Sequence, residues 1–272
     1  MLSKEQVGRG AELITEACAV GRLIEDLPPS CRPQTTEDAY AIQNHIFDSR
    51  NDRTHGWFVS ATNPQMQRQL RLSEPYAARW GHGRFLDSNA EISAPGALPI
   101  ALEAEVTFKL NRALPPRVRA YTAQEVESAI AAVHPSFEVV ISCFTDWVNQ
   151  PPLNLIAEGG PAQLLVTGCG VETWQTLTLN ELPIAATVNG STIARGCSGN
   201  VMDGPVSVLV WLANHASNRG VGLEKGQLCN TGMCAPVFWV NPGDRAVADF
   251  GELGTVEVEV GTYPTNNDAG AN

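Results

Sequence analysis

The chain of 272 residues has no long apolar run and few basic residues. No apolar stretch approaches the roughly 20 residues of a membrane-spanning helix, so we expect no membrane segment. Lys and Arg number 18 against 29 Asp and Glu, giving a formal net charge of -11. Nucleic-acid binding needs concentrated positive charge, which argues against such a partner. The N-terminus also lacks a basic segment followed by an apolar one, which predicts a cytoplasmic protein.

Paired cysteine motifs and phosphate-binding loops are missing as well. The seven cysteines are scattered along the chain and form no CxxC pair. This pattern favours neither a disulfide framework nor a structural zinc site, so we expect mostly buried thiols. There is no GxGxxG and no GxxxxGK[ST] sequence, which removes the usual signals of nucleotide binding.

The periodicity of apolar residues changes once along the chain. Helical spacing over residues 4–26, and a second helix beginning at Thr36, predict a helical region over residues 1–90. Residues 91–262 form a β-rich domain in which two helices, 123–133 and 205–219, interrupt short strands. The predicted strands are 103–110, 137–142, 163–167, 184–188, 237–240, 245–250 and 255–260. Asn189-Gly190 predicts a hairpin turn, and residues 263–272 a disordered tail. The fold class is therefore α+β.

Three carboxylates carry the strongest chemical signal. Glu103 and Glu105 lie in a Leu-Glu-Ala-Glu-Val run, and alternate residues of a strand project from one face. Two acids that share one face repel each other unless a cation lies between them, and a hard divalent ion is the usual solution. Glu138, in Ser-Phe-Glu-Val-Val, is the candidate third ligand. The alternative, left open by spacing alone, is a solvated strand face with Glu138 unrelated.

Several short motifs occur in a familiar order. They include Thr36-Glu-Asp-Ala-Tyr-Ala-Ile-Gln43, Gly56-Trp57, Glu103-Ala-Glu105-Val-Thr-Phe, His134-Pro-Ser-Phe-Glu138, Thr231-Gly232 and Pro242-Gly243-Asp244. In these the chain resembles the 2-oxopent-4-enoate hydratase and 4-oxalocrotonate decarboxylase group of the fumarylacetoacetate hydrolase superfamily. The resemblance implies a β-rich roll decorated by helices. It also implies that residues 91–262 form the catalytic domain, with Mg²⁺ or Mn²⁺ on Glu103, Glu105 and Glu138.

The chain departs from that group where the group carries proton-handling residues. The pocket lysine of the group corresponds to Phe58, and its acid after a proline corresponds to Tyr76. Tyr76, His82 and Glu158 are therefore the candidate catalytic residues; each also has a plainer interpretation, as a packing aromatic, an exposed loop histidine and a turn residue. Phe58, Ser60 and Thr231 are assigned to the substrate pocket.

The resemblance implies a metal-dependent lyase that hydrates a 2-hydroxy or 2-oxo unsaturated carboxylic acid in aromatic ring-cleavage catabolism. Decarboxylation of a 4-oxalocrotonate-like acid and carbon–carbon hydrolysis of an acylpyruvate are alternatives within the superfamily. An alternative of another class is a non-catalytic subunit that retains the metal. The resemblance also implies a homo-oligomer, or a complex with a related decarboxylase or hydratase.

Overall fold

The computed structural model describes residues 1–261, so the predicted disordered tail, 263–272, lies outside the described residues. The helices are α1 (Lys4–Val20), α2 (Thr36–Ser49), α3 (Pro64–Leu70), α4 (Ala123–Glu127), α5 (Pro152–Glu158) and α6 (Pro205–Asn218). The strands are β1 (Gly56–Ser60), β2 (Tyr76–Trp80), β3 (Phe85–Asp87), β4 (Ala90–Ile92), β5 (Ile100–Leu110), β6 (Ile130–Val140), β7 (Ala162–Thr167), β8 (Pro183–Val188), β9 (Ser191–Cys197), β10 (Leu228–Met233), β11 (Phe238–Val240), β12 (Arg245–Asp249) and β13 (Thr255–Val260).

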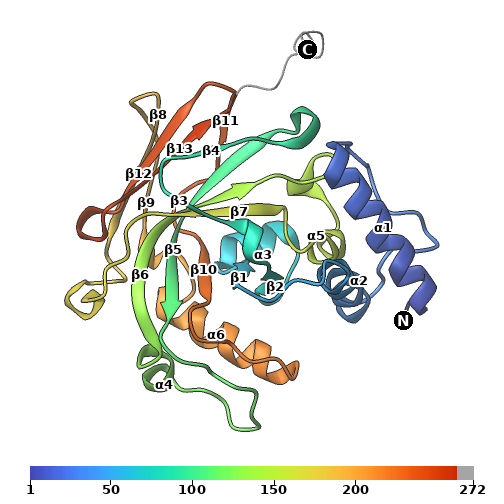
Figure 1. The fold of residues 1–272 in the computed structure, drawn as a ribbon, viewed down its shortest axis with the longest axis horizontal. Helices are drawn as coiled ribbons and strands as arrows, with labels where there is room; N and C mark the ends of the chain where they lie inside the picture. The colour runs from blue at the N-terminus through green and yellow to red at the C-terminus, as the bar shows by residue number, and fades with distance from the viewer. Residues whose placement is uncertain (262–272) are drawn as a thin grey trace.

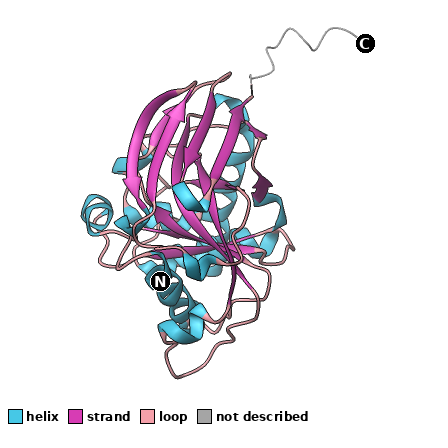
Figure 2. Ribbon diagram, turned by 90° about the vertical axis from the view of Figure 1, so that its left-hand side faces the viewer, coloured by secondary structure: helices cyan, strands magenta, loops and turns pink. Residues whose placement is uncertain are grey.

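The strands form two sheets. The larger has the order β2-β1-β10-β5-β6-β7-β3, with β11 also paired to β5, and the smaller has the order β4-β13-β12-β8-β9. Helices α1, α2 and α5 lie together on one side of the larger sheet (Figure 1). The two sheets stand at a steep angle to each other in Figure 2. This arrangement confirms the predicted α+β class, with a β-rich part decorated by helices.

The long strand β5 separates two apolar cores. Leu102, Ala104 and Val106 pack into the core that contains the smaller sheet and α6. Ala101 packs on the opposite side, into the core that contains α1, α2 and α5. Because side chains alternate along a strand, Glu103 and Glu105 project toward the side of α1, α2 and α5.

Two predicted helices end earlier than expected. Helix α1 ends at Val20, because Gly21 takes a left-handed conformation (φ +65°) and its N–H caps the last turn. The prediction of a helix over 123–133 was wrong beyond residue 127, where α4 ends. Residues from Ile130 onward belong to β6, since pairing with β5 along its whole length outweighs the local helical pattern.

The first ninety residues contribute strands that the sequence did not reveal. Strand β1 pairs parallel with β10, and β3 pairs parallel with β7. Both partners lie after residue 91, so the larger sheet is built from both predicted regions; the division into domains stays a prediction. Asn189 and Gly190 have φ values of +51° and +80° between β8 and β9, which confirms the predicted hairpin turn.

The sequence predicts no membrane-spanning segment, and the helices of the structure bear on this prediction. Within residues 1–261, no helix combines the length and the apolar character that crossing a bilayer requires.

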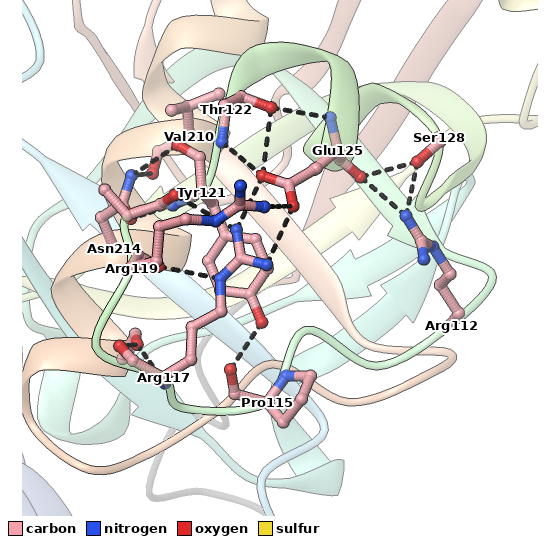
Figure 3. A network of polar contacts seen from close by, with 12 residues as sticks. Arg112, Pro115, Arg117, Arg119, Tyr121, Thr122, Glu125, Ser128, Val210 and Asn214 are labelled. Carbon is pink, nitrogen blue, oxygen red and sulfur yellow. Dashed lines mark hydrogen bonds and ion pairs between the residues drawn. The ribbon is translucent and has the colours of Figure 1, made fainter.

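A polar network holds the segment between β5 and α4 (Figure 3). Arg117 donates from both terminal nitrogens to the Glu125 carboxylate, at 2.9 and 2.7 Å. Arg119 donates to the same carboxylate at 2.7 Å, and Thr122 caps the helix by accepting from the Glu125 N–H. Asn214 of α6 accepts from the Tyr121 N–H at 2.7 Å. Glu125 is therefore the centre that ties this segment to α4.

Replacing Glu125 by Gln should lower stability in a pH-dependent way. The Arg117 guanidinium holds the pKa of the Glu125 carboxyl well below its usual range. A depressed carboxyl pKa contributes stability above the unfolded-state pKa, and this contribution is lost as pH falls through the folded-state pKa. In thermal unfolding, Glu125→Gln should unfold at a lower temperature than wild type at neutral pH. The gap should shrink as the solution is acidified below about pH 4.

The matched control is Glu127→Gln, an exposed carboxylate on the same helix that makes no ion pair within residues 1–261. An equal loss in both variants, or a gap that does not depend on pH, would contradict the role given to Glu125.

Candidate metal centre

Two adjacent strands bring the three predicted carboxylates together. Glu103 of β5 pairs directly with Glu138 of β6, and Glu105 follows two residues along β5. One carboxylate oxygen from each residue lies within 4.8 Å of the others. The three are 9%, 0% and 2% exposed for Glu103, Glu105 and Glu138. The group is therefore a buried cluster, and the interpretation as a solvated strand face is wrong.

Strand β10 supports two of these carboxylates from the other neighbour of β5. Asn230 donates from Nδ2 to Oε2 of Glu138 at 2.8 Å, while its Oδ1 accepts from the Val59 N–H at 2.7 Å. The Gly232 N–H donates to Oε2 of Glu105 at 3.1 Å. An irregularity in the β10–β5 register lies between Asn230 and Met233, and Gly232 there has a φ of +86°. This local break turns the Gly232 N–H toward the carboxylate.

The electrostatics of the cluster call for a cation. Burial raises the pKa of Glu103 to about 7. Burial also raises the pKa of Glu105 and of Glu138 well above the ordinary range, and the charge of the neighbouring carboxylates adds to the shift. Oε1 of Glu105 is buried and has no hydrogen-bond partner among the described residues. Three converging carboxylates with an unpartnered oxygen fit the oxygen donor set of a hard divalent ion such as Mg²⁺ or Mn²⁺.

A small cavity of about 20 Å³ adjoins the carboxylates. Its lining contains Glu103 and Glu138 and no Lys or Arg. Four of its lining residues, Asn63, Met66, Trp147 and Met233, also line an outer groove of about 570 Å³. These four side chains therefore lie between the carboxylates and the outer groove, as a constriction that separates the two spaces.

Two predicted residues share this cavity with the carboxylates. Ser60 and Tyr76 both line it. The Tyr76 hydroxyl is buried and has no hydrogen-bond partner of good geometry among the described residues, although Ser60 lies close enough to lower its pKa. Burial raises the pKa of Tyr76 far above its ordinary value, with Glu138 and Glu103 adding to the shift. Phe58 is buried behind Tyr76, in an edge-to-face contact with ring centroids 5.7 Å apart. It shapes the wall without touching the cavity.

The other three predicted residues lie elsewhere. The Thr231 hydroxyl is buried and donates to the Val106 carbonyl at 2.8 Å, bracing β10 against β5. His82 is exposed at the start of a short 3₁₀ turn, with its ring 4.7 Å from that of His55. Glu158, at the end of α5, accepts from the Ser142 hydroxyl and the Cys143 N–H. Neither His82 nor Glu158 lines the cavity beside the carboxylates.

Several residues of the site could not be predicted from the sequence. Asn230 directly precedes the Thr231-Gly232 motif, but its position in the sequence does not reveal which strands lie beside it in the fold. Trp147, Met66 and Met233 come from three separate segments that meet only in the folded chain. No spacing rule could have connected them.

The family profile described as "Fumarylacetoacetate (FAA) hydrolase C-terminal" matches residues 45–261, most of the chain. The chain belongs to the fumarylacetoacetate hydrolase family. The matched region contains all three carboxylates, which confirms the resemblance read from the motifs.

Relatives within this family resemble the chain over nearly its whole length. The chain is 26% identical to a 2-keto-4-pentenoate hydratase of Paraburkholderia xenovorans, covering 95% of this chain and 96% of the relative. It is 24% identical to a 2-hydroxyhexa-2,4-dienoate hydratase of Comamonas testosteroni, covering 95% and 99%. Its fold matches that of 4-oxalocrotonate decarboxylase from Pseudomonas putida G7, solved with magnesium and adipate. That match has a TM-score of 0.88, 22% identity, and coverage of 96% and 99%.

In the metal-free protein, the free energy of unfolding should decrease as pH rises. A carboxyl whose pKa is raised on folding holds its proton more tightly in the folded state. Its stabilising contribution is complete below the unfolded-state pKa of about 4.3 and declines as pH rises through the folded-state value. Metal-free protein should therefore lose stability from about pH 5 to pH 8. At neutral pH, Mg²⁺ at about one hundred times its Kd should restore about 2.7 kcal/mol.

Glu105→Ala should remove most of the divalent-ion affinity and the stabilisation by Mg²⁺, and should flatten the dependence on pH. Calorimetric titration and urea unfolding at several pH values measure these effects. The exposed Glu252→Ala serves as control and should behave as wild type. Unchanged Mg²⁺ binding in Glu105→Ala would rule out the carboxylate site.

Proposed function

We propose that the protein is a divalent-metal-dependent hydratase acting on a 2-hydroxy or 2-oxo unsaturated carboxylic acid, as in aromatic ring-cleavage catabolism. The observation that carries the proposal is the buried triad of Glu103, Glu105 and Glu138, with the unpartnered Oε1 of Glu105, beside a small cavity. The relatives named as hydratases support the reaction type. Related structures support the ion, since the 4-oxalocrotonate decarboxylase from Pseudomonas putida G7 was solved with magnesium and a fumarylpyruvate hydrolase from Pseudomonas aeruginosa with Mn²⁺ and pyruvate.

The donor set defines the chemistry that this site supports. A divalent ion supplies a Lewis acid that a carboxylate and an adjacent oxygen of a 2-oxo acid can chelate, and that stabilises enolate charge. Asn230 and the Gly232 N–H hold two of the carboxylates in place, so the triad keeps its geometry before any ligand arrives.

Tyr76 is the group best placed to handle a proton. Its hydroxyl is buried in the cavity wall, and the raised pKa keeps it protonated over the physiological range. It can therefore donate a hydrogen bond to substrate, and a proton only to a strongly basic carbon of the substrate, and it does not act as a phenolate base. The hydroxyl of Ser60 is a second polar group in the same lining. His82 and Glu158 lie outside this cavity and therefore take no part in the proposed proton transfer.

The remaining walls select an apolar substrate chain. Leu70, Leu155, Trp147, Met66 and Met233 line the cavity beside the carboxylates. Phe58, with Tyr76 and Trp80, fills the wall at the position where the family resemblance implies a lysine. The substrate is therefore held by its acid end at the metal centre, while its carbon chain contacts apolar side chains and excludes water.

Decarboxylation of a 4-oxalocrotonate-like acid is the second candidate. The structural match to 4-oxalocrotonate decarboxylase, with a TM-score of 0.88, favours it. Both reactions begin from a chelated 2-oxo acid and differ in whether water is added or carbon dioxide leaves. From the family resemblance we also propose a cytoplasmic homo-oligomer, or a complex with a related decarboxylase or hydratase.

Product analysis distinguishes these reactions. The Mg²⁺-loaded protein is incubated with 2-hydroxydienoates, 4-oxalocrotonate and acylpyruvates, and products are identified by mass spectrometry beside Glu105→Ala. We expect a gain of water with a 2-hydroxydienoate that is absent in the variant. Loss of carbon dioxide or chain cleavage would name the second or third reaction. No turnover with metal bound would contradict an enzymatic role and favour a binding subunit.

Tyr76→Phe removes one oxygen and tests the proton donor directly. We expect kcat to fall by about one hundred- to ten thousand-fold, the usual range for a lost acid–base group. Mg²⁺ affinity should stay unchanged, because Tyr76 is not a ligand. The matched control is Tyr121→Phe, whose hydroxyl donates to the Pro115 carbonyl away from the cavity. An active Tyr76→Phe enzyme would show that another group delivers the proton.

A further inference from the structure

A second cluster of metal-ligating side chains lies apart from the carboxylate triad. Cys18 from α1, Cys143 from the segment after β6, and Glu158 from the end of α5 each direct one donor atom to a common point. These atoms all lie within 4.8 Å of one another. The Cys18 Sγ is 3.7 Å from Oε1 of Glu158. Neither thiol is part of a disulfide.

The cluster is held by contacts that do not depend on a ligand. The Cys143 N–H donates to Oε1 of Glu158 and the Ser142 hydroxyl to Oε2, each at 2.8 Å. The Ile24 N–H donates to the Cys143 carbonyl at 2.8 Å, and the Ile24 carbonyl accepts from Thr145 at 2.9 Å. The chain after α1 is thus fixed against the segment that carries Cys143, so the donors are arranged in advance.

The Cys143 thiol carries a proton that a metal ion would displace, and one arginine, Arg84, lies beside the cluster. Burial raises the pKa of Glu158 to about 7, and the hydrogen bond with Cys18, together with burial, raises the pKa of the Cys143 thiol. Arg84 is near enough to interact electrostatically with both Cys18 and Glu158. It makes no ion pair among the described residues, since its Nη1 donates to Ala162 and Gln163. Glu158 lines a cavity of about 30 Å³ together with Arg50, Arg79 and Arg84, and this cavity gives a water access to the Glu158 carboxylate; neither cysteine lines it.

We propose that Cys18, Cys143 and Glu158 form a second metal site, selective for a thiophilic divalent ion such as Zn²⁺. Two thiolates and a carboxylate carry three negative charges, which Zn²⁺ and Arg84 together neutralise. Zn–S and Zn–O bonds of about 2.3 and 2.1 Å in a tetrahedron place sulfur and oxygen about 3.6 Å apart. The observed 3.7 Å between Cys18 and Glu158 matches this edge. A water from the adjoining cavity completes the coordination.

The chemistry of the donors separates this site from the triad. Thiolates select zinc and cobalt, whereas an all-carboxylate set suits Mg²⁺ and Mn²⁺. Binding releases the thiol protons to solvent, so affinity for zinc rises with pH. A bound ion would join α1, the segment after β6 and α5, and the site therefore acts on the stability of the fold. This inference does not depend on the proposed reaction.

Cobalt provides the direct test. Reduced, full-length protein is saturated with Mg²⁺ to occupy the carboxylate triad and then titrated with Co²⁺, followed by Zn²⁺. We expect a near-ultraviolet thiolate-to-cobalt charge-transfer band that saturates at one equivalent and is abolished by Zn²⁺. Cys18→Ser and Cys143→Ser should lose the band, and Glu158→Gln should weaken Zn²⁺ binding at least tenfold.

Matched controls separate the site from general thiol binding. The exposed Cys169→Ser should keep the band. Glu105→Ala should keep it too, even when it abolishes turnover, so failure of this site and failure of the proposed function are distinguishable. Should Cys143→Ser not fold, Cys18→Ser at a partly exposed helix position carries the test.

The proposal is overturned if wild type shows no charge-transfer band, or if the band survives in Cys18→Ser. Recovery of a Cys18–Cys143 disulfide from protein prepared without reductant, together with no retained zinc, would also overturn it.

Discussion

The pairing of β5 with β6 is the constraint on which the site depends. Its register sets Glu103 opposite Glu138 and places Glu105 next along the same face, inside the protein. Burying three carboxylates together is costly unless protons or a cation neutralise them. The two apolar cores on either side of the larger sheet, and the hydrogen bonds from β10, supply the stability that keeps this arrangement folded.

Members of the two clusters of donor atoms lie close together in the chain. Glu138 lies near the end of β6, and Cys143 lies in the segment that follows it. Glu138 lies beside two other carboxylates, and Cys143 lies beside Cys18 and Glu158. The triad offers oxygen donors alone, whereas the second cluster combines two sulfur donors with the Glu158 carboxylate, although only a few residues of chain separate Glu138 from Cys143. The two thiols are what would distinguish the ion of the second cluster from that of the triad.

The sequence predicted what depends on local pattern and could not predict what depends on distant contacts. The period-two alternation of a strand predicted that Glu103 and Glu105 share one face, and Asn189-Gly190 predicted a hairpin turn. Both patterns depend only on residues that are neighbours in the chain. The apolar run Ile130 to Val133 is ambiguous by itself, and only its pairing with β5 makes it a strand. His82 and Glu158 were chosen by chemical type, and the fold places both outside the cavity. Cys18, Cys143 and Glu158 are far apart in the chain, so their contact in the fold could not be predicted from the spacing of the cysteines.

The constriction between the cavity and the outer groove has a kinetic consequence. The inner space of about 20 Å³ holds roughly one water molecule, so a substrate cannot enter without moving side chains. Two of the four residues at the constriction, Met66 and Met233, have flexible, unbranched side chains. Rotamer changes of Met66 and Met233 are one way to enlarge this space for a substrate. The same entrance can fit acids of different widths, at the cost of a step that must precede every turnover.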